Sequence, residues 1–302
     1  MIQGLGTALV TPFTGNGAVD YEGMTRLLDI QLQGKVDFLV VLGTTGEAAT
    51  LHPQERREVR RFIARYIDSR IPLVLGFGGN NTAQIVADLQ VEAKELQEDY
   101  AAILSVCPYY NKPNQEGLYQ HFCAIAEASP IPVILYNVPG RTGVNLLPET
   151  VMRIYNAHPD KIIGIKEASG NLDQIKRLII LTGEAGLTAK RSNNKAAQQR
   201  SSLLVFSGDD GIACEVMEAG GDGLISVASN AFPDDFRKIV HDCDAALQTK
   251  YAELIKLLFA EGNPVGIKAV LAQQGIIGNY LRLPLVPATQ ELQAKITRFL
   301  SA

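Results

Sequence analysis

The 302-residue sequence has no tryptophan, and its four cysteines and four histidines are scattered along the chain. The cysteines, at positions 107, 123, 214 and 243, show no C-x-x-C spacing, and the histidines do not cluster with them. Zinc sites and disulfide frameworks both need such clusters. We therefore expect no bound metal, and free thiols of the kind found in a reducing cytoplasm.

Long apolar runs and a strong charge imbalance are also missing. No segment reaches the roughly 20 apolar residues that a membrane-spanning helix needs. The N-terminus lacks the charged region and apolar core of a leader peptide. The net charge of −4 gives no reason to expect nucleic acid or an anionic membrane as a partner. We expect a cytoplasmic protein.

Short apolar runs alternate with amphipathic segments throughout most of the chain. The runs predict strands at residues 5–10, 38–42, 71–77, 101–106, 131–136, 162–166, 203–207 and 223–227. The segments between them predict helices at residues 19–33, 53–67, 82–97, 116–128, 148–157, 172–182 and 212–219. Eight such units predict an α/β fold, a (β/α)8 barrel over residues 1–231 with a C-terminal helical region at 232–302.

A doubly wound open sheet is the alternative fold. It would place a glycine-rich dinucleotide motif after the first strand, where this sequence has Thr11-Pro12-Phe13. The glycines at 76, 78 and 79 follow the third predicted strand, and we interpret them as relief of crowding at a barrel mouth.

Residues 183–202 are longer than a usual connection between a helix and a strand. They hold Lys190, Arg191, Lys195 and Arg200 among small polar residues. We expect a solvated surface insertion. A contact patch for another subunit or for an anion is the alternative.

Lys166 ends the apolar run Ile162–Ile165, which predicts a strand buried on both faces. Burial is costly for an ammonium group and favours the neutral amine, which is a nucleophile for carbonyl carbon. The alternative is an ordinary lysine that ends a strand and extends its amine to water.

In a barrel the carboxyl ends of the strands meet at one mouth, so polar residues that follow the strands should gather there. These candidates are Thr44, Thr45, Tyr109, Tyr110, Tyr136, Arg141, Lys166, Asp209 and Asp210, with Ile225 and Ser226 ending the eighth strand. A Schiff-base lysine needs no separate cofactor, hydroxyl groups can pass protons, and an arginine can bind a carboxylate bidentately. The set predicts a small 2-keto acid and a second carbonyl compound with a carboxylate as substrates.

Each candidate also has a purely structural interpretation. Thr44-Thr45 and Asp209-Asp210 could cap helices, and Tyr109-Tyr110 could be a half-buried aromatic pair. Tyr136 could be an ordinary core residue, and Arg141 could lie on a surface turn. The occurrence of all of them at successive strand ends favours the functional interpretation.

Three stretches together resemble the dihydrodipicolinate synthase family, also called 4-hydroxy-tetrahydrodipicolinate synthase. They are Gly43-Thr44-Thr45-Gly46-Glu47, Tyr136-Asn137-Val138-Pro139 with Arg141-Thr142-Gly143, and Gly164-Ile165-Lys166-Glu167-Ala168-Ser169-Gly170. The resemblance implies condensation of pyruvate with L-aspartate 4-semialdehyde to 4-hydroxy-tetrahydrodipicolinate, in the biosynthesis of lysine and diaminopimelate.

The resemblance also implies roles for single residues. Lys166 would form the Schiff base with pyruvate, and Tyr136, Thr45 and Tyr110 would form a proton relay. Thr44 and Thr45 would hold the pyruvate carboxylate, Arg141 would bind the aldehyde's carboxylate, and Gly208 and Ile225 would line the pocket. Tyr110 would reach a neighbouring subunit's site, which implies a dimer at least, and a tetramer built as a dimer of dimers in most members.

Sugar-acid aldolases such as N-acetylneuraminate lyase share the lysine and the tyrosine, so they remain an alternative, as does a non-catalytic small-molecule sensor. Arg141 and the Thr44-Thr45 pair favour the synthase. Where the family's feedback site for lysine is expected, this sequence has Ala48, Pro53, Arg56 and Gln84. An added arginine disfavours a cationic ligand, so we expect weak or absent inhibition by lysine.

Overall fold

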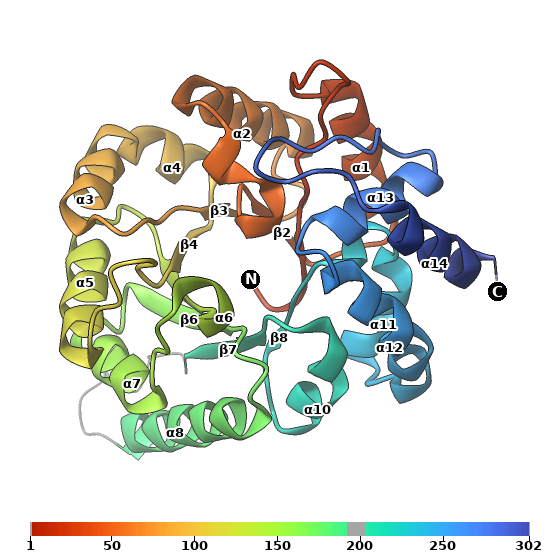
Figure 1. Ribbon diagram of the computed structural model, residues 1–302. Helices are drawn as coiled ribbons and strands as arrows, with labels where there is room; N and C mark the ends of the chain where they lie inside the picture. The colour runs from red at the N-terminus through yellow and green to blue at the C-terminus, as the bar shows by residue number, and fades with distance from the viewer. Residues whose placement is uncertain (1, 192–202, 302) are drawn as a thin grey trace. The chain divides into compact units, whose positions relative to one another are not determined.

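Figure 1 shows the computed structural model, which describes residues 2–191 and 203–301, with backbone alone for 184–191. Its strands are hydrogen-bonded in chain order and close into a barrel. They are β1 (Gly4–Ala8), β2 (Phe38–Val41), β3 (Leu73–Gly76), β4 (Ala102–Val106), β5 (Val133–Asn137), β6 (Ile162–Glu167), β7 (Leu204–Ser207) and β8 (Gly223–Ser226). The predicted (β/α)8 barrel is confirmed.

Helices follow the strands along the chain. They are α1 (Tyr21–Gln33), α2 (Pro53–Ile67), α3 (Thr82–Val91), α4 (Ala93–Asp99), α5 (Gln115–Ala128), α6 (Pro139–Thr142), α7 (Pro148–Ala157), α8 (Leu172–Arg191) and α10 (Ala213–Glu218). The C-terminal helices are α11 (Pro233–His241), α12 (Ala245–Phe259), α13 (Val265–Gln273) and α14 (Gln290–Leu300). Short 3-10 turns are η1 (Thr44–Gly46), η2 (Ala48–Thr50), η3 (Asp210–Ile212) and η4 (Ala228–Asn230).

The chain forms two compact units, of which the first comprises residues 1–75 and 225–302 and the second residues 76–224. The predicted boundary at residues 231 and 232 stays a prediction, although helices do follow the last strand as expected. In the first unit, β2 pairs in parallel with β1 and β3. Helix α11 packs on β1 and α12, and α12 packs on α13 and α14.

Local sequence signals account for the ends of the first two helices. Asp20 caps α1 by accepting a hydrogen bond from the Gly23 amide (2.9 Å), and Gly34 follows its last turn, as predicted. Helix α2 begins at Pro53, where proline's missing N–H leaves no hydrogen bond unmade. Its capping box joins His52 and Glu55.

In the second unit, β4, β5, β6, β7 and β8 pair in parallel. Helix α7 packs on α5 and β6, and α8 packs on α7 and β7, so these helices cover the outside of the strands (Figure 1). The strands are almost fully buried, because the barrel interior covers one face and the helices cover the other.

The predicted insertion at 183–202 was wrong in its first part. Helix α8 continues to Arg191, so residues 183–191 extend the helix. The rest of the predicted insertion lies outside the described residues. The predicted helix at 82–97 is instead two helices, α3 and α4, which meet at Glu92.

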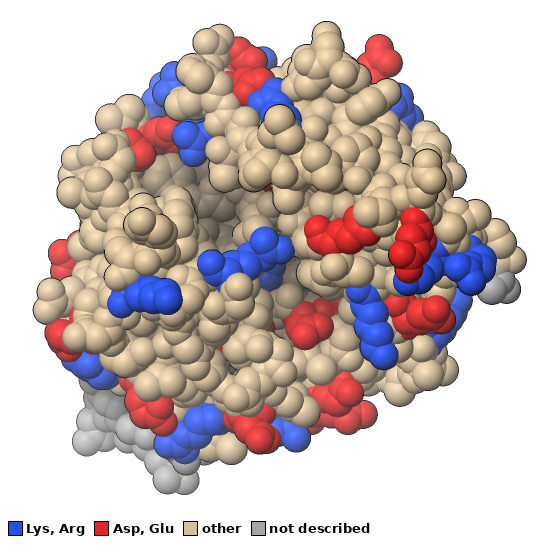
Figure 2. All heavy atoms as spheres, in the orientation of Figure 1, with Lys and Arg blue, Asp and Glu red and all other residues tan. Residues whose placement is uncertain are grey.

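No helix in the described ranges is long and apolar enough to cross a membrane. On the face drawn in Figure 2, basic and acidic side chains are interspersed, and uncharged residues form most of the surface.

His121 on α5 is buried and shares a hydrogen bond with the Thr82 hydroxyl (2.8 Å), and burial lowers its pKa to about 4. The unfolded chain binds a proton at His121 near pH 6.5, whereas the folded chain binds it only near pH 4. Burial of the neutral imidazole therefore contributes its full share of the folding free energy above about pH 6.5. The contribution is lost as the pH falls from 6.5 to 4, and we expect about 2 kcal/mol to be lost by about pH 5.

His121→Leu removes this titration. Urea denaturation at about pH 7.5 and about pH 5 should show a smaller acid-induced loss of stability in the variant than in the wild type. Equal losses in the two proteins would contradict the assignment.

Candidate functional site

Lys166 lies at the end of β6 and is buried, with 6% of its surface exposed. In the sheet it pairs directly with Tyr136 at the end of β5. The Nζ atom lies 4.7 Å from the centroid of the Tyr136 ring, and Tyr136 is buried as well. The alternative interpretation, in which the lysine extends to water, was therefore wrong.

The surroundings of Lys166 suit a nucleophilic amine. Among the described residues, no carboxylate lies within ion-pair distance of the Lys166 amine, although the side chain is buried. A side chain at position 208 would collide with it, because a Cβ atom on Gly208 would lie 3.0 Å from the Lys166 Cε atom. The glycine therefore lets Ala168 and the lysine stem pack closely at this point.

Thr44 and Thr45 follow β2 in the first unit and form the start of η1. Thr45 is buried, and its Oγ1 atom accepts a hydrogen bond from the Asn263 side-chain amide (2.9 Å), whereas Thr44 is exposed. Neither threonine caps a helix, because η1 follows Gly43 and has no side-chain cap. The capping interpretation was therefore wrong for this pair.

A buried ion pair lies directly after these threonines. Glu47 and Lys268 are almost fully buried, and their side chains are in direct contact. Burial lowers the pKa of Lys268 to about 8, against the opposing effect of Glu47. Glu47 also accepts a hydrogen bond from the Arg282 amide (3.2 Å), and the Lys268 Nζ atom lies 4.1 Å from the Phe13 ring centroid.

Sequence reasoning missed Lys268, although the signal was present. Lys268 lies in Val265–Ala272, a run of mostly apolar residues, which is the pattern that singled out Lys166. Asn263 was missed too, because nothing local to Asn263-Pro264 indicates a contact with a threonine 218 positions away.

The tyrosines after β4 lie at the surface of the chain. Tyr110 is 89% exposed and has a φ of 76°, a backbone region that non-glycine residues rarely adopt. Tyr109 is half exposed, and its carbonyl accepts a hydrogen bond from the Asn80 side-chain amide (3.1 Å). The interpretation of a half-buried aromatic pair therefore fails for Tyr110.

The remaining candidates divide between surface and interior. Arg141 is exposed on α6, and Ile225 is buried in β8. Asp209 accepts a hydrogen bond from the Gly211 amide (2.8 Å) at the start of η3, which confirms its interpretation as a cap. Asp210 is buried. The structure thus brings Lys166, Tyr136 and Gly208 together in the second unit.

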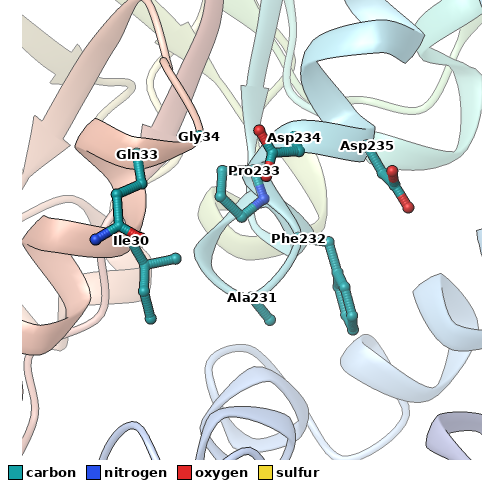
Figure 3. A pocket seen from close by; sticks show the side chains of 8 residues that line it. All are labelled: Ile30, Gln33, Gly34, Ala231, Phe232, Pro233, Asp234 and Asp235. Carbon is teal, nitrogen blue, oxygen red and sulfur yellow. The ribbon is translucent and has the colours of Figure 1, made fainter.

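A hollow of about 280 Å³ lies between the end of α1 and the start of α11 (Figure 3). Its lining residues are Ile30, Gln33, Gly34, Ala231, Phe232, Pro233, Asp234 and Asp235. It contains none of the predicted site residues. Within the described part of the chain, no group of histidine, cysteine, aspartate or glutamate side chains is arranged to hold a metal ion.

A (β/α)8 barrel with a lysine buried at the end of its sixth strand is the architecture of a class I aldolase-type enzyme, in which an amine attacks a carbonyl carbon. The comparisons with known proteins narrow this class. A sequence model of the dihydrodipicolinate synthetase family matches residues 1–302, so the chain belongs to this family.

Individual relatives agree over the full length. The 4-hydroxy-tetrahydrodipicolinate synthase of Azobacteroides pseudotrichonymphae genomovar. CFP2 is 44% identical over 310 residues, which cover 99% of this chain and 97% of that protein. The crystal structure of dihydrodipicolinate synthase from Thermotoga maritima is similar with a TM-score of 0.89 and 40% identity, covering 100% of this chain and 98% of that one. The chloride-inhibited enzyme from Acinetobacter baumannii, complexed with pyruvate, has a TM-score of 0.88 and 37% identity over 100% and 98% of the two chains.

The contribution of the buried Glu47–Lys268 ion pair to stability can be tested by substitution. Lys268→Ala leaves the Glu47 carboxylate buried without its cation, so we expect the free energy of unfolding to fall by about 3–5 kcal/mol in urea denaturation. Lys295→Ala, which removes an exposed pair with Glu291 on α14, is the control and should change stability little. Similar unfolding midpoints for Lys268→Ala and the wild type would contradict the importance of the buried pair.

Proposed function

We propose that Lys166 is the nucleophile of a 4-hydroxy-tetrahydrodipicolinate synthase reaction. The chain is a lyase of the dihydrodipicolinate synthetase family, and it condenses pyruvate with L-aspartate 4-semialdehyde in lysine and diaminopimelate biosynthesis. The observation that carries the residue assignment is the buried Lys166 amine over the face of Tyr136, at the end of β6.

The chemistry follows from an amine and a 2-keto acid. The Lys166 Nζ atom attacks C2 of pyruvate to give a carbinolamine, which loses water and becomes an iminium ion. Loss of a proton from C3 gives an enamine, and C3 then forms a bond to the aldehyde carbon of the second substrate. The amino group of that substrate displaces Lys166 at C2, which closes the ring and frees the lysine.

Each of these steps moves a proton, and we assign that work to Tyr136, Thr45 and Tyr110. Phenol and alcohol hydroxyls can donate one proton while accepting another, so a chain of them connects a buried site to water. The Asn263 amide donates to Thr45, which leaves the threonine's own proton free to be given to a neighbour.

Tyr110 supports an oligomeric assembly. A large aromatic side chain that is 89% exposed on a strained backbone is poorly placed to act within its own chain. We assign Tyr110 to the relay of a partner subunit, in a homo-oligomer of dimer or tetramer form.

The substrate carboxylates need separate partners. We assign the pyruvate carboxylate to Thr44 and Thr45, and the carboxylate of aspartate semialdehyde to Arg141, which can bind it with two parallel hydrogen bonds. Gly208 and Ile225 line the pocket in this proposal. No further cofactor enters it, and a cytoplasmic location suits the four free cysteines.

Reduction of the iminium by borohydride tests the proposal. With pyruvate present, the wild type should gain a reduced pyruvate adduct that peptide mass spectrometry locates at Lys166. Lys166→Met should gain none and lose at least about a thousandfold in kcat. Lys161→Ala removes the lysine that immediately precedes the same strand, and this variant should label normally. An adduct at any other lysine would overturn the assignment.

Inhibition by lysine is predicted to be weak. Pro53, Arg56 and Gln84 are exposed, Ala48 offers no acceptor, and Arg56 adds a positive charge that repels a cationic ligand. Steady-state assays with lysine at up to millimolar concentration should therefore show little loss of activity. Strong inhibition at micromolar lysine would refute this interpretation of the four positions.

A further inference from the structure

A second polar pair lies immediately beside Tyr136 and Lys166. Asn137 and Glu167 are the next residues on β5 and β6, and they too are partners in the sheet. Side chains alternate between the two faces of a strand, so Asn137 and Glu167 point away from the face that carries Tyr136 and Lys166. Both are fully buried, so every one of their polar atoms needs a partner.

Glu167 obtains its partners from three segments of the second unit. Its Oε2 atom accepts hydrogen bonds from the side-chain amides of Asn137 (2.9 Å) and Gln174 (3.0 Å). Its Oε1 atom accepts one from the Ser169 backbone amide (2.8 Å). Glu167 therefore ties β5, α8 and the turn after β6 to one point.

The same hydrogen bonds extend to the segment that carries Arg141. The Asn137 Oδ1 atom accepts from the Leu146 backbone amide (2.9 Å), and its Nδ2 atom donates to the Asn145 Oδ1 atom (2.7 Å). The side chains of Asn145 and Gln174 exchange two hydrogen bonds, of 2.8 and 3.1 Å. The chain thus leaves β5 after Asn137, and residues 145 and 146 return to hydrogen-bond the Asn137 side chain.

We propose that Asn145 is a positioning residue for Arg141, acting through a buried network with Asn137, Glu167 and Gln174. The network fixes both ends of the segment 138–146 against the strand that bears Lys166. It therefore sets the distance between the guanidinium that binds the aldehyde's carboxylate and the amine that carries the enamine. This inference rests on the proposed roles of Lys166 and Arg141.

A substitution at Asn145 should disrupt the network without unfolding the chain. It is only half-buried, and the backbone around it has a second anchor in Gln115. The Gln115 side-chain amide donates to the Asn145 backbone carbonyl (2.8 Å), and the Gln115 side-chain carbonyl accepts from the Leu147 backbone amide (3.1 Å). Asn145→Ala keeps these two bonds, the Leu146 bond to Asn137 and the three to Glu167, while it removes the side-chain hydrogen bonds that join residue 145 to Asn137 and Gln174.

The experiment compares KM for the two substrates. Asn145→Ala should raise KM for aspartate semialdehyde about tenfold, because small misplacements of a binding group are costly. KM for pyruvate and the extent of borohydride trapping should stay near wild type. Asn156→Ala, at an exposed position on α7, is the matched control and should change neither KM.

A double variant separates this inference from the proposed function. If Asn145 acts through Arg141, adding Asn145→Ala to Arg141→Ala should raise KM for the aldehyde no further. If Arg141→Ala alone leaves that KM unchanged, the proposed role of Arg141 is wrong. If Arg141→Ala raises it and Asn145→Ala does not, or if Asn145→Ala only lowers the urea midpoint, the positioning role is overturned.

Discussion

Burial of the Lys166 amine is the constraint on which the site depends. Lys166 is held away from water at the end of β6, and no carboxylate among the described residues lies within ion-pair distance of its amine. Its amine lies over the face of Tyr136, and Gly208 packs close to its Cε atom. These features suit an amine that forms and breaks bonds to carbon during each catalytic cycle.

Each compact unit places a buried carboxylate directly beside its predicted site residues, and the two carboxylates are satisfied differently. Glu47 follows the threonines of the first unit and is paired with Lys268. Glu167 follows Lys166 in the second unit and is bound by neutral amides. A carboxylate paired with Lys166 would stabilise the lysine's ammonium form. The donors to Glu167 are neutral amides, so they hold its carboxylate without adding a second cation near Lys166.

Sequence patterns predicted the fold well where a feature depends only on residues close together in the chain. The bounds of α2 and α7 follow from proline at the first turn and apolar periodicity, and the burial of Lys166 follows from the run Ile162–Ile165. The contacts that organise the site could not be predicted, because they join distant positions. Asn263 and Thr45 are 218 positions apart, and Asn137 and Glu167 are 30 apart. Lys268 could have been predicted, because it lies in an apolar run like the one that ends at Lys166.

The most direct test of Lys166 as the nucleophile is a crystal structure of this protein grown with pyruvate. If Lys166 is the nucleophile, continuous electron density will join the Lys166 Nζ atom to C2 of pyruvate, with the Tyr136 hydroxyl beside the adduct. Pyruvate bound without a covalent link to Lys166, or density joined to a different lysine, would contradict it.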